Sequence, residues 1–520
     1  MVPPLDLTLR RQGGGERKKL RQDAVRFTRC LIADTSVHTE RLRTDTADMT
    51  STPQVRNPAA ILTVMCAGMF LVLLDVTIVN VALPAIGRGL HTDIASLQWV
   101  VDGYVVAIAG LLLAAGTVGD RIGHRRMLLA GFAVFGLASL ACALAPSVGV
   151  LIAARVVQGV GGALLLPSTM AVIVDVFPDR AEQAKALGTW AAVSSLALPA
   201  GPLLGGILVD RLGWRPVFWI AVPLTIAATV AARIVVPAAP PRRGERIDVP
   251  GLAGFVLGLG ALVFAVISAG HHAGTAVVGT AAVVAVCALA GAYLSARRSA
   301  HPFLPVDLLR HKDFLAPNVV ALMMNLIFNG ILFIGMLYLQ DTLGRSPGAA
   351  GVSVLPLALP LVLLAPVSGR LTARYGPRPA IAIGCALAAC GSAMLLTLDD
   401  RGGSGGLLLS FTVLGCGSGL ITTSVVAATV RATPADRSGL ATGVSNTARQ
   451  VGTACGVAIF GAVAGSPTGP GFVGAIHRLA AGSTLAWMVA LLITVFAVEA
   501  GESAAADSGR DSRLTEPARR

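Results

Sequence analysis

Three ionisable side chains stand inside long apolar stretches of the 520-residue sequence. Asp75 lies in LVLLDVTIVNVALP, Asp102 in WVVDGYVVA and Arg155 in LIAARVVQGV. A charge at the centre of a bilayer costs roughly 2.5–3.5 kcal/mol on insertion scales, so such residues are rare there and mark ion or proton pathways. A carboxyl group can bind and release a proton, and a permanently charged guanidinium beside it influences that step. These residue types therefore predict proton transfer.

Each of the three also has a structural interpretation. Asp75 would be an acid paired with a neighbouring helix, Arg155 a side chain that reaches the outer surface, and Asp102 a hydrated acid at the outer interface. Asp75 is 14 residues above Ile61 and Arg155 is 17 above Val172, which places them about 21 and 25 Å from the inner ends of their helices at 1.5 Å per residue. The similar depth predicts that Asp75 and Arg155 can meet if their helices are neighbours.

The composition requires a lipid environment. Hydrophobic residues make up 54% of the chain and charged residues 13%, and the mean hydropathy is +0.73. A soluble globular domain carries about 25% charged residues, so a water-soluble fold of this length could not cover its own surface. The net charge of +13 does not indicate nucleic-acid binding, because the arginines fall in short loops between apolar runs.

Apolar runs of about 18–25 residues recur from residue 58 onwards, close to the roughly 20 residues that a helix needs to cross the bilayer. We therefore predict an all-α integral membrane protein with fourteen transmembrane helices. The predicted spans are 61–83, 98–118, 127–145, 149–172, 186–209, 216–236, 250–270, 276–295, 315–339, 351–371, 379–397, 406–428, 439–464 and 482–499.

The charge distribution predicts the orientation. Residues 1–57 carry both signs of charge and no apolar run of spanning length, so we expect a disordered cytoplasmic tail there and a second one at 500–520. With residues 1–57 inside, the cytoplasmic loops hold roughly 17 Lys and Arg against about 6 in the outer loops. Both termini are thus expected to be cytoplasmic. The excess of arginine over lysine, with abundant Ala, Gly and Val, indicates a GC-rich bacterial genome and hence a bacterial cytoplasmic membrane.

The sequence contains an internal repeat. GTVGDRIGHR from Gly116 resembles GRLTARYGPR from Gly369, an offset of about 253 residues. Two homologous six-helix halves at 58–236 and 315–499, with two inserted helices at 250–295, are the simplest explanation. Duplicated halves are typical of transporters whose substrate site lies between them near the membrane midplane.

Several motifs, in the right order and on the right spans, resemble the major facilitator superfamily, specifically its fourteen-span branch of drug:proton antiporters. The motifs are LDVTIVNVALP, LIAARVVQGVGGA and SGLATGVSNTARQVGTACG. The resemblance covers about residues 58–499. It implies a major facilitator fold, and it implies proton coupling by Asp75 and Arg155, with Asp102 as the next candidate.

Two further motifs have roles that the resemblance implies. GTVGDRIGHRR implies a conformational latch, with its arginines facing anionic headgroups, formed by Gly116, Asp120, Arg121, Gly123 and Arg125. The second copy of this motif has Ala373 where Asp120 would align, so the latch is expected to be asymmetric. The fifth predicted span carries the antiporter motif, in which proline and glycine bend the helix and let another backbone approach, with Gly188, Gly201, Pro202, Gly205 and Gly206.

We therefore expect a proton-coupled antiporter that exports small hydrophobic or cationic drugs or antibiotics by alternating access, as a monomer surrounded by membrane lipid. The alternative is an uptake symporter or facilitator of the same fold for a small metabolite, against which the fifth-span motif argues. A membrane-embedded enzyme or sensor would need a nucleophile, a metal cluster or an appended domain, and the longest loops offer none. No nucleic-acid partner is expected.

The energy source is expected to be the proton gradient. The sequence has no Walker-type GxxxxGK[ST] loop, so ATP hydrolysis is not expected. No cofactor or metal is expected either, because His271 and His272 have no cysteine or acidic residue beside them. The predicted tenth span, 351–371, contains no Asp or Glu, so this span offers no negative side chain to pair with one charge of a dicationic substrate.

Residues 1–48 are predicted to be dispensable, because they contain no span and too little apolar content to form a core. A chain that starts at Met49 should confer the same drug resistance as the full chain, within about twofold. The measurement is the inhibitory concentration in a pump-deficient bacterium, with equal membrane levels verified by immunoblot. Loss of efflux at equal levels would contradict the prediction.

Overall fold

The computed structural model describes residues 57–177, 179–237, 248–270, 274–299, 302, 307–398, 405–433, 438–467, 469 and 471–498. All regular secondary structure in these ranges is helical, as the sequence predicts. The expected tails at 1–57 and 500–520 lie outside the described residues except for Asn57, whose side chain caps the first helix by accepting a hydrogen bond from the backbone nitrogen of Ala60.

The N-terminal half contains six predicted spans, two of which are divided. Pro199 and Pro202 lie just after the division at Leu196, where proline removes backbone hydrogen-bond donors from the helix. The helices are α2 (Pro58–Leu90), α3 (Ile94–Ile122), α4 (His124–Ala143), α5 (Val148–Val176), α6 (Arg180–Ser195), α7 (Ala197–Leu212), α8 (Pro216–Trp219) and α9 (Ala221–Val235).

The inserted pair consists of α10 (Val249–Gly270) and α11 (Thr275–Arg298). Short helical turns η1 (Leu308–Arg310), η2 (Tyr338–Thr342) and η3 (Leu395–Thr397) accompany the helices of the C-terminal half. These helices are α12 (Lys312–Leu337), α13 (Pro347–Tyr375), α14 (Pro377–Met394), α15 (Gly405–Arg431), α16 (Ser438–Ala464) and α17 (Phe472–Ala497).

Thirteen helices of the described chain are long and apolar enough to cross a membrane. The remaining predicted span is α16, which has 27 residues and is long enough. Its sequence contains Asn446, Arg449 and Gln450, and these polar residues lower its hydropathy. The structure packs α16 between α3 and α12, so protein covers two sides of this helix.

The last helix begins ten residues earlier than predicted, at Phe472 rather than at residue 482. His477 and Arg478 interrupt the apolar run, and the hydropathy pattern therefore hides the start of the helix. The structure holds this turn in place through His477, whose Nε2 lies 2.8 Å from the backbone oxygen of Leu398.

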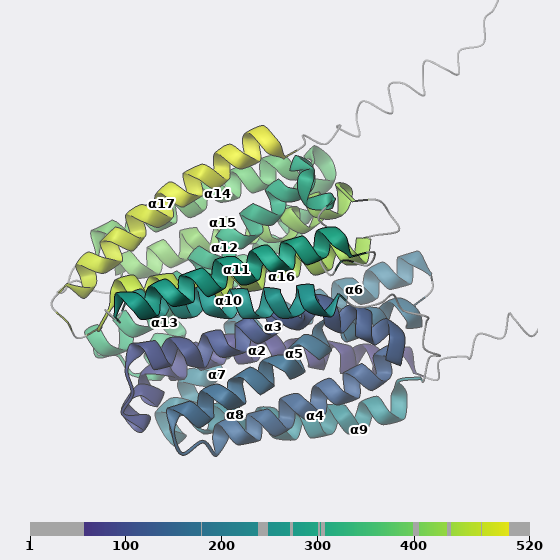
Figure 1. The fold of residues 1–520 in the computed structure, drawn as a ribbon, viewed down its shortest axis with the longest axis horizontal. Coiled ribbons are helices and arrows are strands. Elements are labelled where there is room, and N and C mark those ends of the chain that lie inside the picture. Colours follow the sequence, from purple (N-terminus) through teal and green to yellow (C-terminus); the bar gives the residue numbers. More distant parts are fainter. Residues whose placement is uncertain are drawn as a thin grey trace, which may run out of the picture. The chain divides into compact units, whose positions relative to one another are not determined.

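The inserted hairpin packs along the line where the two halves meet (Figure 1). Helix α10 contacts α3 of the N-terminal half and α16 of the C-terminal half. The rings of Trp99 and Phe264 are 6.4 Å apart, and Gly270 lies directly against Ala462. The hairpin is thus part of the transporter body and not a separate appendage.

The internal repeat is visible in the backbone and in its side-chain contacts. Gly123 and Gly376 occupy equivalent helix ends, with φ of 95° and 82°, a region that glycine adopts readily. Arg125 donates from Nη2 to the backbone oxygen of Arg233, 2.7 Å away, at the end of α9. Arg378 makes the equivalent bond to the end of α17. Arg125 therefore caps a helix of its own half, whereas its expected contact with lipid headgroups stays a prediction.

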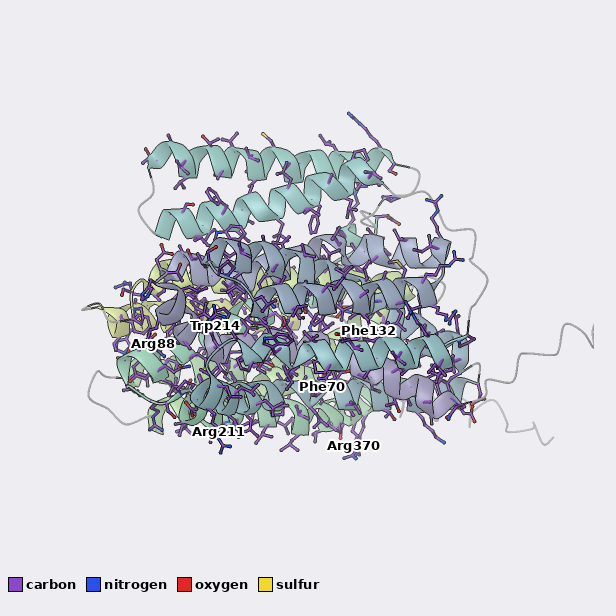
Figure 2. All side chains as sticks on the ribbon, turned by 90° about the horizontal axis from the view of Figure 1, so that it is seen from below. Phe70, Arg88, Phe132, Arg211, Trp214 and Arg370 are labelled. Carbon is purple, nitrogen blue, oxygen red and sulfur yellow. The ribbon has the colours of Figure 1, made fainter. Side chains whose placement is uncertain are left out.

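Hydrogen bonds join the two halves at the end of the bundle where α2 terminates. Arg88 lies at this end, near Trp214 (Figure 2). The side chain of Gln98 donates to the backbone oxygens of Val457 and Ala458, and that of Gln340 donates to the backbone oxygen of Val81. Arg88 donates to the carboxylate of Asp341, and the backbone nitrogen of Gly348 donates to the carboxylate of Asp210. The two halves are therefore in contact, and the bundle is closed, at this end.

Candidate functional site

Asp75 and Arg155 meet in the interior of the N-terminal half. Arg155 Nη1 of α5 forms a hydrogen bond and an ion pair with Asp75 Oδ2 of α2. Asp75 is 5% exposed and Arg155 is 1% exposed. The predicted contact between them is confirmed. A buried pair of this kind persists only when further hydrogen bonds satisfy the rest of both groups.

Gln158 supplies those further bonds. Its Nε2 donates to Asp75 Oδ1 at 2.9 Å and to Ser139 Oγ at 2.9 Å, and its Oε1 accepts from Arg155 Nη1 at 2.7 Å. Both oxygens of Asp75 are therefore engaged by donors. Sequence reasoning missed Gln158, although its position three residues after Arg155 puts both side chains on one face of α5.

The guanidinium of Arg155 is fixed from α3 as well. Its Nε donates to the backbone oxygen of Val100 at 2.8 Å, and its carbon lies 4.2 Å from the centre of the Tyr104 ring. Tyr104 in turn donates from its hydroxyl to the backbone oxygen of Val72, 3.2 Å away. The interpretation that Arg155 reaches the outer surface is therefore wrong. Tyr104 is a second member of the site that the sequence did not reveal.

Asp102 lies apart from this network. It is fully buried, and no protein donor in the described part of the chain reaches either carboxylate oxygen. It stands one turn after Gln98 on α3 and is close enough to Cys455 of α16 to interact with it electrostatically. The interpretation as a hydrated interfacial acid is wrong, because α16 covers this face of α3.

The fifth-span motif packs α7 against α2. A Cβ on Gly201 would overlap the Thr77 side chain, and one on Gly205 would stand 3.0 Å from the backbone oxygen of Ile78. The Thr77 hydroxyl lies 3.1 Å from the backbone oxygen of Ala197 at the start of α7. Only glycine permits this approach, which takes place two residues along α2 from Asp75.

The same motif packs the other side of α7 against α13. A Cβ on Gly206 would stand 2.7 Å from the Cα of Gly348, and one on Gly351 would overlap the backbone oxygen of Pro202. Helix α7 thus lies between α2 and the opposite half. Gly188 differs from the other motif residues, because no atom lies within 4 Å of the position of its Cβ.

The predicted latch is only partly described. The side chain of Asp120 lies outside the described residues, and Arg121 is exposed. Gly123 forms the turn between α3 and α4, and Gly116 faces Pro167 of α5 at 4.0 Å from its Cβ position. The structure thus describes the turn of this motif, whereas the acid–base contact of a latch stays a prediction.

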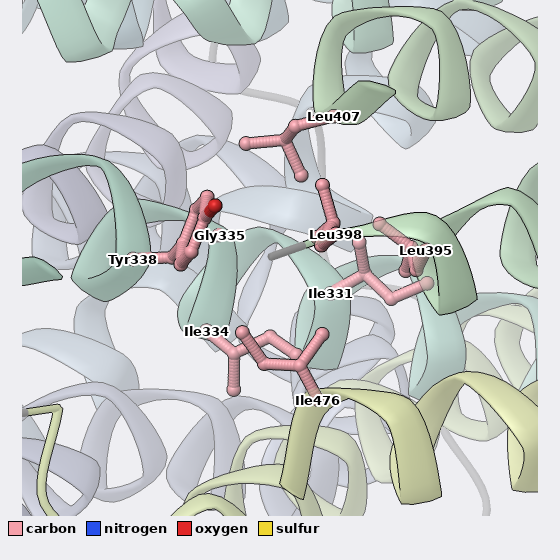
Figure 3. A pocket seen from close by; sticks show the side chains of 8 residues that line it. All are labelled: Ile331, Ile334, Gly335, Tyr338, Leu395, Leu398, Leu407 and Ile476. Carbon is pink, nitrogen blue, oxygen red and sulfur yellow. The ribbon is translucent and has the colours of Figure 1, made fainter. Parts of the chain in front are cut away.

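A small pocket lies inside the C-terminal half (Figure 3). It is lined almost entirely by apolar groups from α12, η2, η3, α15 and α17 and from Leu398, which follows η3. The residues are Ile331, Ile334, Gly335, Tyr338, Leu395, Leu398, Leu407 and Ile476. It lies within one half and away from the Asp75 network, so it does not match a substrate site between halves.

Comparison with known protein families assigns the chain. The Major Facilitator Superfamily matches residues 65–457. The chain belongs to this superfamily. It is therefore a multi-pass membrane transporter of small molecules and not an enzyme, and the predicted major facilitator fold is confirmed.

Similar proteins of known name confer or mediate drug resistance. The chain is 33% identical to the multidrug resistance protein Stp of Mycobacterium tuberculosis, over 76% of this chain and 74% of that protein. It is 35% identical to the tetracenomycin C resistance and export protein of Streptomyces glaucescens, over 80% of this chain and 77% of that protein. It is also 35% identical to the methylenomycin A resistance protein of Streptomyces coelicolor, over 81% of this chain and 89% of that protein.

Solved structures share the fold at low sequence identity. A peptide transporter in complex with sulfate superimposes with a TM-score of 0.62 at 16% identity, covering 84% of this chain and 94% of that chain. The transporter PepTSo gives a TM-score of 0.61 at 15% identity, and the superposition covers 88% of this chain and 99% of that chain. These likenesses support the fold alone.

The glycines of the fifth span give a direct prediction. Gly206→Val should reduce transport at least about tenfold, because its added carbons meet the backbone of Gly348, which cannot move without separating α7 from α13. Gly188→Val is the matched control and should stay within about twofold of the original protein, since its Cβ position is open. Transport in membrane vesicles is the measurement. Equal activity of both variants at equal insertion would contradict the proposed contact.

Proposed function

We propose that this transporter is a proton-coupled antiporter that exports small hydrophobic drugs or antibiotics across the cytoplasmic membrane of a bacterium. The observation that carries the proposal is the buried network of Asp75, Arg155 and Gln158, a carboxylate held by two donors in the membrane interior. The names of the similar resistance and export proteins support the direction and the substrate class.

Protonation of Asp75 is the proposed coupling step. The carboxylate accepts bonds on both oxygens in this conformation, which suits its ionised form. A proton on one oxygen removes the charge and turns that oxygen into a donor, so it becomes a much weaker acceptor for the same partner and its O–H needs an acceptor of its own. Arg155 would then face a neutral group and the network would rearrange. Proton binding and release thus favour different arrangements of α2 and α5.

Helix α7 connects this site to the opposite half. Thr77 follows Asp75 by two residues and contacts α7, and the other face of α7 packs on α13 through Gly206. A shift of α2 on protonation is therefore transmitted through α7 to the contact between the halves. Packed backbones without intervening side chains leave little freedom to absorb such a shift.

The closed end of the bundle is proposed to be the outer end. With both termini in the cytoplasm, α2 starts inside and ends outside, so the bonds formed by Gln98, Gln340 and Arg88 close the outer side. A state closed at the outer end is the one that would receive substrate from the cytoplasm or the inner leaflet. A monomer suffices for this cycle, because each chain contains both halves.

Asp102 is proposed as a second proton-binding residue. A buried polar group without a partner is costly, so a proton or a transient donor is expected to reach it during the cycle. It lies at the contact between α3 and α16, which must open when the halves rock. Its environment therefore changes between the two access states, as a coupling residue requires.

The orientation can be tested by reporter fusions. We expect a fusion at Arg520 to be active as a cytoplasmic reporter and inactive as an alkaline phosphatase, because fourteen spans return the chain to the starting side. A fusion at Gly344, in the turn between η2 and α13, should show the reverse pattern and serves as the control. Phosphatase activity at Arg520 would overturn the assignment.

The function itself is tested by resistance profiling and vesicle transport. Expression in a pump-deficient bacterium should raise the inhibitory concentration of at least one antibiotic, and inside-out vesicles should accumulate that compound when a pH difference is imposed. Asp75→Asn should abolish this accumulation, at least about a tenfold loss, because an amide cannot exchange the proton yet still accepts a bond from Arg155. Binding of the compound should change by less than about threefold, since the site lies within one half.

Arg155→Lys and Asp341→Asn complete the experiment. Lysine keeps the charge but cannot reach Asp75, Gln158 and Val100 at once, so transport should fall about tenfold or more. Asp341→Asn keeps an oxygen that can accept from Arg88 and weakens only one partly exposed contact among several at this end, so coupling should change by less than about threefold. Accumulation by Asp75→Asn at the original level would exclude Asp75 as the coupling residue and leave Asp102.

A further inference from the structure

Arg449 is an arginine at mid-length of α16 whose guanidinium makes no hydrogen bond or ion pair within the described part of the chain. It follows Ser438 by 11 residues, about 16 Å along the helix at 1.5 Å per residue. Its side chain is partly accessible, and its nitrogens are not sealed off by protein atoms. Arg155, in contrast, donates from Nε and Nη1 to Val100, Asp75 and Gln158. Helix packing therefore does not account for Arg449.

The face of α16 that carries Arg449 is polar and is turned towards α12. Asn329 of α12 donates to Thr453 Oγ1 at 3.1 Å, and Gly452 and Gly456 lie against the backbone of Leu322 and Leu326. The two glycine contacts are four residues apart on both helices, so α12 and α16 run parallel and stay in contact over one turn. Arg449 stands one turn before Thr453, whose hydroxyl also donates to the backbone oxygen of Arg449, 3.1 Å away. The turns of α16 that follow Arg449 thus pack on α12 through an amide, a hydroxyl group and two backbones in close contact.

Among the described helices of the C-terminal half, the acids lie at helix ends: Asp313 is in the first turn of α12, and Asp341 of η2 is paired with Arg88. The sequence from Phe314 to Gln340 has no Asp or Glu, and between Thr342 and Ala497 the only acidic residues are Asp399, Asp400 and Asp436, which fall between the helices of the described chain. A cation within the bundle that lacks a protein counter-charge is costly. It can be retained where an anion from outside the chain completes the pair.

The acids of the N-terminal half do not complete the pair either. Asp75 is engaged by Arg155 and Gln158. Asp102 is close enough to Cys455 to interact with it electrostatically, and Cys455 follows Arg449 by six residues, which places it about 240° around α16 from Arg449 at 100° per residue. Asp102 of α3 thus faces a different side of α16 from the side that carries Arg449.

We propose that Arg449 binds the anionic group of the exported compound, and that the substrates are hydrophobic molecules with an acidic group such as a carboxylate, a sulfonate or an ionised phenol. This inference rests on the proposed export function and specifies its substrate class. The guanidinium provides two parallel donors for such a group, and the neighbouring amides and apolar side chains accommodate the rest of the molecule.

Two fluorescent probes with one scaffold test the inference. Anilinonaphthalenesulfonate carries a sulfonate, and N-phenylnaphthylamine is its neutral counterpart. Binding of each is measured on the full-length protein in nanodiscs, with the signal of empty nanodiscs subtracted. The unsubstituted protein should bind the anion, and Arg449→Gln should weaken that binding at least about tenfold while binding of the neutral probe stays within about twofold.

Two further variants separate charge recognition from general effects. Arg370→Gln removes one positive charge from the exposed end of α13, where the side chain points away from the bundle (Figure 2), and should leave binding of both probes unchanged. Arg449→Lys keeps the charge but offers a single ammonium, so binding of the anion should weaken by about threefold to tenfold. If Arg449→Gln does not give a monodisperse protein, the lysine variant carries the test.

The outcomes are distinct. The inference is overturned if Arg449→Gln weakens binding of both probes equally. It is also overturned if the original protein does not bind the anion, or if both Arg449 variants bind the anion with unchanged affinity. Resistance profiling provides a second test, since Arg449→Gln should lose protection against acidic hydrophobic antibiotics such as fusidic acid and keep protection against neutral ones. An original protein that exports only neutral or cationic compounds overturns the inference alone, whereas one that exports no compound overturns the proposed function.

Discussion

The ion pair between Asp75 and Arg155 is the interaction on which the N-terminal half depends. Both groups lie in the membrane interior, where removing one partner of a buried pair costs about 3–5 kcal/mol. The pair is stable because Gln158 and the backbone oxygen of Val100 bind the remaining polar atoms. Helices α2, α3 and α5 must therefore keep fixed relative positions for as long as Asp75 stays ionised. A change in its protonation is the smallest event that releases this constraint.

Close backbone contacts convert that local constraint into a property of the whole bundle. Helix α7 lies against α2 through Gly201 and Gly205 and against α13 through Gly206. In lipid no hydrophobic force drives helices together, so close packing of small residues and polar contacts provide the association. The same packing holds the N-terminal half on the C-terminal half at one end, where Gln98 and Gln340 add hydrogen bonds.

The two halves share a repeat but differ in chemistry. Arg125 and Arg378 cap the last helix of their own half in the same way, and Gly123 and Gly376 form the same turn. The acids of the membrane interior, however, lie in the N-terminal half, and the unpaired Arg449 lies in the other. Duplication thus explains the shared scaffold. Divergence of a few intramembrane residues explains the different roles that we propose, proton coupling in the N-terminal half and substrate recognition in the C-terminal half.

The sequence by itself determined the elements and the residues of interest. Apolar length and charge placement are local properties, so the fourteen spans and the ionisable side chains Asp75, Asp102 and Arg155 could be predicted from the sequence. The tertiary structure decided which of them meet, because contacts between helices depend on rotation and register that periodicity does not specify. Gln158 and Tyr104 joined Asp75 and Arg155 in this way. Asp102 proved buried, since α16 covers a face that the sequence leaves exposed to the interface.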